Sequence, residues 1–166
     1  MENHLVQSYI TQLRELFAGE PWIEETFEKK LKKVTGEIAF KKPWETMHSV
    51  AELISHLTVW KREVLSRLKG EQATGLTMNS AANWKSNHEL RQQNLFHLLK
   101  SFVEVQKQLL TFLENKPDDF LLKIDDEKNV TYDYYIRGLI QHDAYHLGQI
   151  GLVLKILLWE KDGTHS

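Results

Sequence analysis

The feature that most constrains this chain is the long segment from about Tyr132 to Glu160. It contains no proline, and its apolar residues recur at the three-and-four spacing of a helix with one buried face. His142 and His146 fall on that same face, four residues apart. The other members of the stripe are Leu139, Ile150 and Val153. The segment therefore predicts a long amphipathic helix that carries two histidines toward the interior of a helical protein.

The spacing of the two histidines allows them to share one metal ion. Side chains four residues apart lie on one helix face, roughly 5–6 Å apart at Cβ. Two neutral imidazoles at that spacing can converge on an ion at about 2.0–2.1 Å each. The chain has eight histidines in 166 residues, however, so composition alone produces such pairs often. Taken alone, the pair leaves a metal site and ordinary core or surface histidines as equal alternatives.

The same periodicity predicts three further long helices, over residues 3–18, 49–69 and 86–115. A shorter amphipathic helix is expected over residues 22–34. Long amphipathic helices with connections that can cross between them are typical of a four-helix bundle, in which metal sites are built from side chains on facing helices. We therefore predict an all-α four-helix bundle.

Two capping boxes mark the starts of the second and third long helices. Ser49 is followed by Glu52, and Ser86 by Glu89, so that each side chain can satisfy a free backbone donor of the first turn. Between these helices, residues 70–85 form a polar connection without periodicity. Loops of that length are often functional, and we expect this loop to cover or border a site.

The connection before the last helix is acidic and irregular. Its apolar run Phe120–Ile124 is expected to form a short extended piece, and Thr131 is expected to cap the last helix.

The absence of cysteine excludes several kinds of chemistry. It removes disulfides, cysteine zinc sites and any thiol nucleophile of the chain itself. A metal ion must therefore be held by nitrogen and oxygen, and thiol chemistry would need a thiol that arrives as a cosubstrate.

Charge and hydropathy set further expectations. The net charge of −2 lacks the basic footprint of a nucleic-acid binder, so we expect no nucleic-acid partner. No apolar run approaches the length of a membrane span, and the N-terminus lacks a signal-peptide pattern, so we expect no membrane partner and a cytoplasmic location. The length predicts one domain over residues 1–166, with a polar tail from about residue 160.

A third histidine completes a candidate metal site. His56 lies beside Leu57 and one turn before Trp60, on or near the apolar face of the helix over 49–69. If that helix and the last one are neighbours, His56, His142 and His146 can meet. Three protein ligands leave coordination positions open, which is the arrangement of catalytic rather than structural sites. A divalent ion at such a site lowers the pKa of bound water toward neutrality.

These residues resemble the DinB-like, or YfiT-like, superfamily. The resemblance rests on the stretch from His48 to Trp60, on the histidine pair and on Gly148–Ile150, and it extends over nearly the whole chain. It implies up-down-down-up topology, a bound divalent metal, often nickel or zinc, and a homodimer. It also implies that His56, His142 and His146 are the metal ligands.

The superfamily implies more than one function. Some relatives transfer low-molecular-weight thiols such as bacillithiol, or isomerise substrates with mycothiol. The first hypothesis is therefore a metal-dependent enzyme, either a thiol S-transferase or a small-molecule hydrolase, with no residue assigned as its base. The second is a non-catalytic metal-binding or interaction bundle, and the fourth coordination position distinguishes the two. Because histidine ligands must be neutral, metal affinity is expected to fall as the pH drops through roughly 6.

Residues beside the histidines allow competing interpretations. Asp143 gives the pattern His142-Asp143-x-x-His146, which is similar to the helix of zinc proteases, but that site usually needs a third ligand downstream. A surface role, or support of the ligands, is the preferred interpretation of Asp143. Tyr145 and Gln149 remain open between pocket, core and solvent. The other histidines lack a partner at ligand spacing and are treated as ordinary: His4, His48, His88, His97 and His165.

Overall fold

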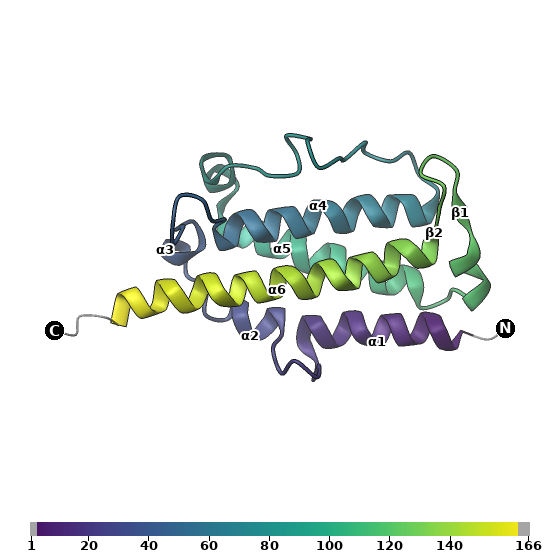
Figure 1. Cartoon of the computed structure of the whole chain (residues 1–166), viewed down its shortest axis with the longest axis horizontal. Coiled ribbons are helices and arrows are strands. Elements are labelled where there is room, and N and C mark those ends of the chain that lie inside the picture. Colours follow the sequence, from purple (N-terminus) through teal and green to yellow (C-terminus); the bar gives the residue numbers. More distant parts are fainter. Residues whose placement is uncertain (1–2, 163–166) are drawn as a thin grey trace.

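Four long helices run along the length of the computed structural model, which describes residues 3–162 (Figure 1). They are α1 (His4–Ala18), α4 (Val50–Lys69), α5 (Asn87–Leu113) and α6 (Tyr132–Asp162). The outer two of the sequence, α1 and α6, run in one direction, and α4 and α5 run in the other (Figure 1). The predicted all-α four-helix bundle and its up-down-down-up topology are therefore confirmed.

Five short elements connect the long helices. They are α2 (Phe27–Leu31), α3 (Gly36–Ala39), the 3-10 helix η1 (Asp118–Leu122), β1 (Ile124–Asp125) and β2 (Val130–Thr131). The two strands form a small antiparallel hairpin in which Ile124 pairs with Thr131. The extended piece predicted over 120–124 is thus mostly a 3-10 helix. The predicted cap is confirmed, because Thr131 Oγ1 accepts a hydrogen bond from the Tyr134 backbone N–H at 3.2 Å.

The helix predicted over residues 22–34 is wrong at both ends, since α2 covers only its middle. Glu24 adopts a left-handed backbone conformation, with φ of 59°, which interrupts a helix. Thr26 then caps α2, and its Oγ1 accepts a hydrogen bond from the Lys29 backbone N–H at 3.1 Å. Trp22, which the periodicity placed in the helix, is 96% exposed.

The starts of α4 and α5 follow their sequence signals. Both capping boxes, Ser49 with Glu52 and Ser86 with Glu89, form as predicted. At its other end α4 stops at Gly70, whose left-handed φ of 69° suits a glycine.

The direction of α4 and α5 determines the path of the chain between them. Because the two helices are parallel, residues 70–85 must cross back over the length of the bundle before α5 can begin (Figure 1). This crossing places the loop beside α4.

Two apolar clusters fill the bundle. One includes Ile10, Leu65 and Leu139, and the other includes Phe27, Phe102 and Leu147. Along α6, the predicted ligands at 142 and 146 fall between Leu139 and Leu147, where one cluster gives way to the other. The core thus provides rigid support on both sides of a polar layer.

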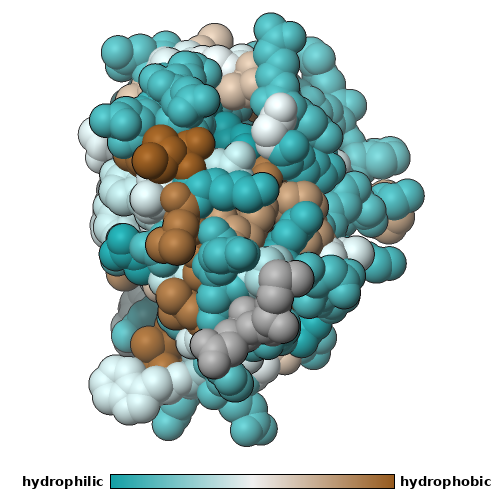
Figure 2. Space-filling view, turned by 90° about the vertical axis from the view of Figure 1, so that its right-hand side faces the viewer, coloured by the Kyte–Doolittle hydropathy of each residue, from teal (hydrophilic) through white to brown (hydrophobic). Residues whose placement is uncertain are grey.

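The surface of the bundle is largely polar. Figure 2 shows the end that carries the β1–β2 hairpin, where apolar side chains are separated by polar ones. The exposed large apolar residues of the elements at this end include Leu5, Leu122, Ile124 and Tyr134. Within residues 3–162, no helix is both long and apolar enough to cross a membrane. The end of the predicted polar tail, after residue 162, lies outside the described residues.

Candidate metal centre

The three predicted ligands come together between α4 and α6. His56 projects from α4, and His142 and His146 project from consecutive turns of α6. One ring nitrogen from each lies within 4.8 Å of the others, and the Nε2 atoms of His56 and His142 are 2.9 Å apart. Two nitrogens on one ion at about 2.0–2.1 Å would be separated by roughly 2.9–3.4 Å. The spacing of these imidazoles therefore fits a shared metal ion.

The protonation of the three rings also fits a cation. Burial lowers the pKa of His56 to about 4 and, with the two neighbouring rings, that of His142 to about 3. Burial also lowers the pKa of His146. All three are therefore neutral near pH 7, as ligands must be. His142 Nδ1 is buried without a hydrogen-bond partner among the described residues, so the protein alone does not satisfy this ring.

Two hydrogen bonds orient the rings of His56 and His146, the outer two of the triad. His56 Nδ1 lies 3.1 Å from the backbone oxygen of Asn83, to which it can only donate, and this leaves Nε2 as the free lone pair. His146 Nδ1 lies 2.6 Å from Gln149 Oε1 and donates to it in the same way. Such bonds fix the tautomer and orientation of metal-binding histidines. Of the interpretations left open for Gln149, the pocket is the one that the structure supports, because Gln149 lines the cavity as well as bonding to His146.

The loop over residues 70–85 forms one wall of the site, as predicted. Asn83 is buried, its Oδ1 accepts a hydrogen bond from Trp60 Nε1 at 2.8 Å, and its Nδ2 donates to the Met78 backbone oxygen at 2.9 Å. Trp84 stacks on His56, with ring centroids 3.9 Å apart and the planes 4° from parallel. Its other face stacks on His48 at 3.7 Å. The loop thus holds His56 by both its edge and its face.

A buried ion pair lies behind the triad. Lys61 of α4 has no exposed surface, and its Nζ donates a short hydrogen bond to Asp143 Oδ2 of α6. Burial raises the pKa of Asp143, and the Lys61 ammonium opposes that rise. The surface role considered for Asp143 is therefore wrong. The zinc-protease interpretation also fails, because Asp143 is not among the residues that line the cavity and the third histidine comes from upstream.

A cavity of about 690 Å³ opens beside the triad. All three histidines reach it, so an ion held by them would have one side open to the cavity. Within residues 3–162, the group that could hold the ion consists of these three histidine side chains. The cavity wall comes from α4, the 70–85 loop and α6, and includes Trp60, Val64, Met78, Trp84, Tyr134, Tyr135 and Tyr145.

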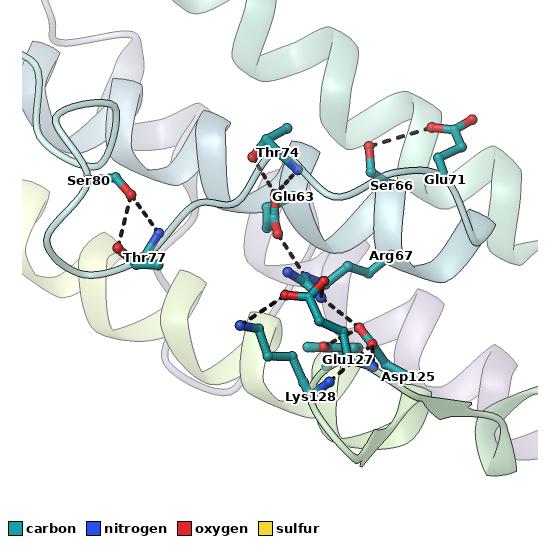
Figure 3. Close-up of polar contacts among 11 residues, drawn as sticks. Glu63, Ser66, Arg67, Glu71, Thr74, Thr77, Ser80, Asp125, Glu127 and Lys128 are labelled. Atoms are coloured by element: carbon teal, nitrogen blue, oxygen red, sulfur yellow. Dashed lines mark hydrogen bonds and ion pairs between the residues drawn. The ribbon is translucent and has the colours of Figure 1, made fainter.

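A charged network surrounds Arg67 near the C-terminal end of α4 (Figure 3). Arg67 Nε donates to Glu63 Oε1 at 2.7 Å, and Arg67 Nη1 donates to Asp125 Oδ2 at 2.8 Å. Glu63 Oε2 also accepts the Thr74 backbone N–H at 3.0 Å, which ties the loop to α4. Tyr135, a residue of the cavity wall, donates its hydroxyl to Asp125 Oδ2 at 2.6 Å. The network therefore joins the loop, the hairpin and α6 around the end of α4.

Sequence reasoning missed several members of this site. His48, treated as ordinary, lines the cavity, and Asn83, Trp84 and Lys61 support the triad. A tryptophan inside a polar loop was the one signal that could have found Trp84, because such a ring needs an apolar surface to cover it. The signal for Lys61 was its position among the apolar residues of α4.

An all-α bundle with three histidines that face a cavity defines a class of helical protein able to hold a metal ion. The sequence profile of the DinB superfamily matches residues 22–150, and the chain belongs to that superfamily. No curated protein matches the sequence.

Two solved structures share the fold. A conserved protein from Enterococcus faecalis has 16% sequence identity and a TM-score of 0.67, over 95% of this chain and 98% of the other. The colibactin self-resistance protein ClbS, in complex with dsDNA, has 20% identity and a TM-score of 0.63, over 90% of this chain and 95% of the other.

The ClbS complex corrects one expectation. We expected no nucleic-acid partner from the net charge, and that expectation is wrong, because a protein of this fold is in complex with dsDNA. The net charge is a sum over the whole surface and hides local clusters. Here Lys29, Lys30, Lys32 and Lys33 are concentrated in and just after α2.

Proposed function

We propose that His56, His142 and His146 bind one divalent transition metal, nickel or zinc, and that the protein is a metal-dependent enzyme. The reaction class is transfer of a low-molecular-weight thiol of the bacillithiol type, or hydrolysis of a small molecule. The observation that carries the proposal is the trio of neutral imidazole nitrogens on one side of a 690 Å³ cavity. A divalent ion at such a site acts as a Lewis acid that activates a water or a thiol.

The chain's own residues have defined parts in this proposal. The three histidines bind the ion, while Asn83 and Gln149 hold the outer two rings in the ligating tautomer. The loop over 70–85 and the aromatic side chains of α4 and α6 form the wall against which a substrate would lie. Because the chain has no cysteine, a thiol in the reaction must enter as a cosubstrate.

Metal binding is the first test. Metal-free protein titrated with nickel or zinc should bind one ion per chain, measured by calorimetry and by elemental analysis of the desalted complex. His56→Ala should weaken binding on the order of 100-fold or more, because it removes one of three ligands. His88→Ala, at an exposed histidine of α5, is the matched control and should bind as the parent does. Equal affinity of His56→Ala and the parent would contradict the proposal.

Turnover is the second test. Metal-loaded protein should conjugate a thiol to a small electrophile or hydrolyse an activated ester, and both rates should fall in His56→Ala. The alternative is a non-catalytic metal-binding bundle. A complex that binds its ion tightly but is inactive against broad thiol and ester panels would favour that alternative.

A further inference from the structure

Two aromatic side chains of the cavity wall use their polar atoms to bind residues that do not line the cavity. Trp60 donates its Nε1–H to Asn83 at 2.8 Å, and Tyr135 donates its hydroxyl to Asp125 at 2.6 Å. Both hydrogen-bonding groups are thus used by the protein itself. What these residues can offer to a ligand is their ring carbon.

Other large apolar groups of the same wall are open to solvent. Met78 is 72% exposed, Tyr145 is 64% exposed and Tyr134 is 58% exposed. They come from the loop and from two separate turns of α6, yet they line one cavity. Apolar surface gathered in a concave site is the usual mark of a small-molecule pocket, and a volume of about 690 Å³ is in the range of such sites.

Charge is scarce on this wall. Among the residues that line the cavity, Arg137 alone carries a permanent charge, and its Nε already donates to Asp133 at 2.7 Å. A ligand with several charges would lose its hydration here and find only the proposed ion as an ionic partner. A flat apolar ring can instead stack on the faces of several aromatic side chains, an interaction that adds to the burial of its area.

We propose that the cavity takes an aromatic small molecule, with at most one negative charge, whose donor atom is directed at the histidine triad. This inference rests on the proposed function and names its substrate class. The aromatic ring lies against the wall formed by Trp60, Tyr134, Tyr135 and Tyr145, and the donor atom approaches the open side of the three imidazoles.

The experiment uses three carboxylates of similar acidity as probes: acetate, cyclohexylacetate and phenylacetate. Each is titrated into the cobalt(II)-loaded full-length protein, and binding is followed by the visible absorption of the ion. Phenylacetate should bind about 10-fold or more tighter than acetate, and about 3-fold or more tighter than cyclohexylacetate, which is apolar but not flat. Tyr134→Ala should reduce the preference for phenylacetate about 3-fold, whereas Trp22→Ala, at an exposed ring outside the cavity, should leave it unchanged.

The outcomes separate this inference from the proposed function. If cobalt binds and the three probes bind alike, or cyclohexylacetate equals phenylacetate, the aromatic substrate class is overturned while the metal centre stands. If cobalt does not bind, the proposed function fails. Quenching of tryptophan fluorescence by phenylacetate in the metal-free protein then tests whether the cavity still binds an aromatic ring. Quenching that Tyr134→Ala weakens supports an aromatic pocket, and its absence overturns it.

Discussion

Lys61 shows how much the site depends on single charges. Its side chain is fully buried, with its ammonium shared between Asp143 and, at 5.7 Å, the ring face of Phe102. A buried ion pair adds little net stability when both partners are present. Loss of one partner, in contrast, leaves an uncompensated charge in the core.

The first prediction therefore concerns this pair. Lys61→Met should lower the free energy of unfolding by about 3–5 kcal/mol, measured by chemical denaturation of the metal-free protein. The double variant Lys61→Met/Asp143→Leu should recover most of that loss, because it removes both charges. Lys32→Met, which breaks an exposed pair with Glu28, should change stability by less than about 1 kcal/mol. A double variant as unstable as the single one would show that packing, and not charge, dominates.

Asn83 supports a second prediction at this scale. Asn83→Ala removes the acceptor of Trp60 and the donor to Met78, so the backbone oxygen that orients His56 becomes less fixed. Metal affinity should fall about 10-fold or more, as is typical when a group that orients a ligand is lost. Asn79→Ala, at an exposed position of the same loop, is the control. If both variants bind metal as the parent does, Asn83 has no role in positioning His56.

At the scale of elements, the long helices were predictable and the loop contacts were not. The stripe at 139, 142, 146, 150 and 153 and the two capping boxes located α4, α5 and α6, because periodicity and caps are local signals. The 70–85 loop has no periodicity. Its length and polarity could predict that it covers or borders a site, but not which of its residues contact the triad. The break of the predicted helix at Glu24 could not be predicted either, because a glutamate gives no signal for a left-handed backbone conformation.

The anchor of that loop gives the third prediction. Thr74 binds Glu63 Oε2 through its hydroxyl as well as its backbone N–H (Figure 3). Thr74→Val removes the hydroxyl, so amide hydrogen exchange over residues 71–85 should accelerate, while the global free energy of unfolding changes by about 1 kcal/mol. Thr111→Val, on the exposed face of α5, should alter neither. Unchanged exchange in the loop would show that the backbone bond alone holds it.

The charged network at the end of α4 predicts a response to strong acid. Burial alone would raise the pKa of Asp125, but hydrogen bonds from Tyr135 and Arg67 outweigh it and lower the pKa to about 2. The stability that this carboxylate contributes is present above its ordinary pKa and is lost as the pH falls toward 2. After allowance for solvent screening, the loss should be about 1 kcal/mol, and Asp125→Asn should remove this part of the acid dependence.

For the whole molecule, the triad predicts a pH dependence in a different window. The pKa of His56 is about 4 in the folded protein and about 6.5 in an unfolded chain. Between these values the unfolded chain binds more protons, so the stability of the metal-free protein should fall as the pH drops from 6.5 to 4. The slope of unfolding free energy against pH should be smaller in His56→Leu. An equal slope in the two proteins would contradict this assignment.

The same shifts revise the expected loss of metal. Free imidazoles would release an ion as the pH drops through roughly 6, but burial lowers the pKa of His56 to about 4 and that of His142 to about 3, and it lowers the pKa of His146 as well. Metal should therefore be retained at lower pH than the sequence suggested. The sequence predicted that His56, His142 and His146 meet, and they do, yet it could not predict how burial changes their basicity. The homodimer that the resemblance implies stays a prediction.

The parallel course of α4 and α5 has a consequence for variation among proteins of this architecture. An antiparallel pair can be joined by a few residues, whereas this parallel pair requires a connection long enough to run the full length of the bundle. That connection places Asn83 and Trp84 against His56. Exchange of residues 71–85 between two such proteins would therefore alter cation affinity and ligand preference together. The helices themselves would not need to change, so this segment is the natural place for the site to vary while the helical bundle stays the same.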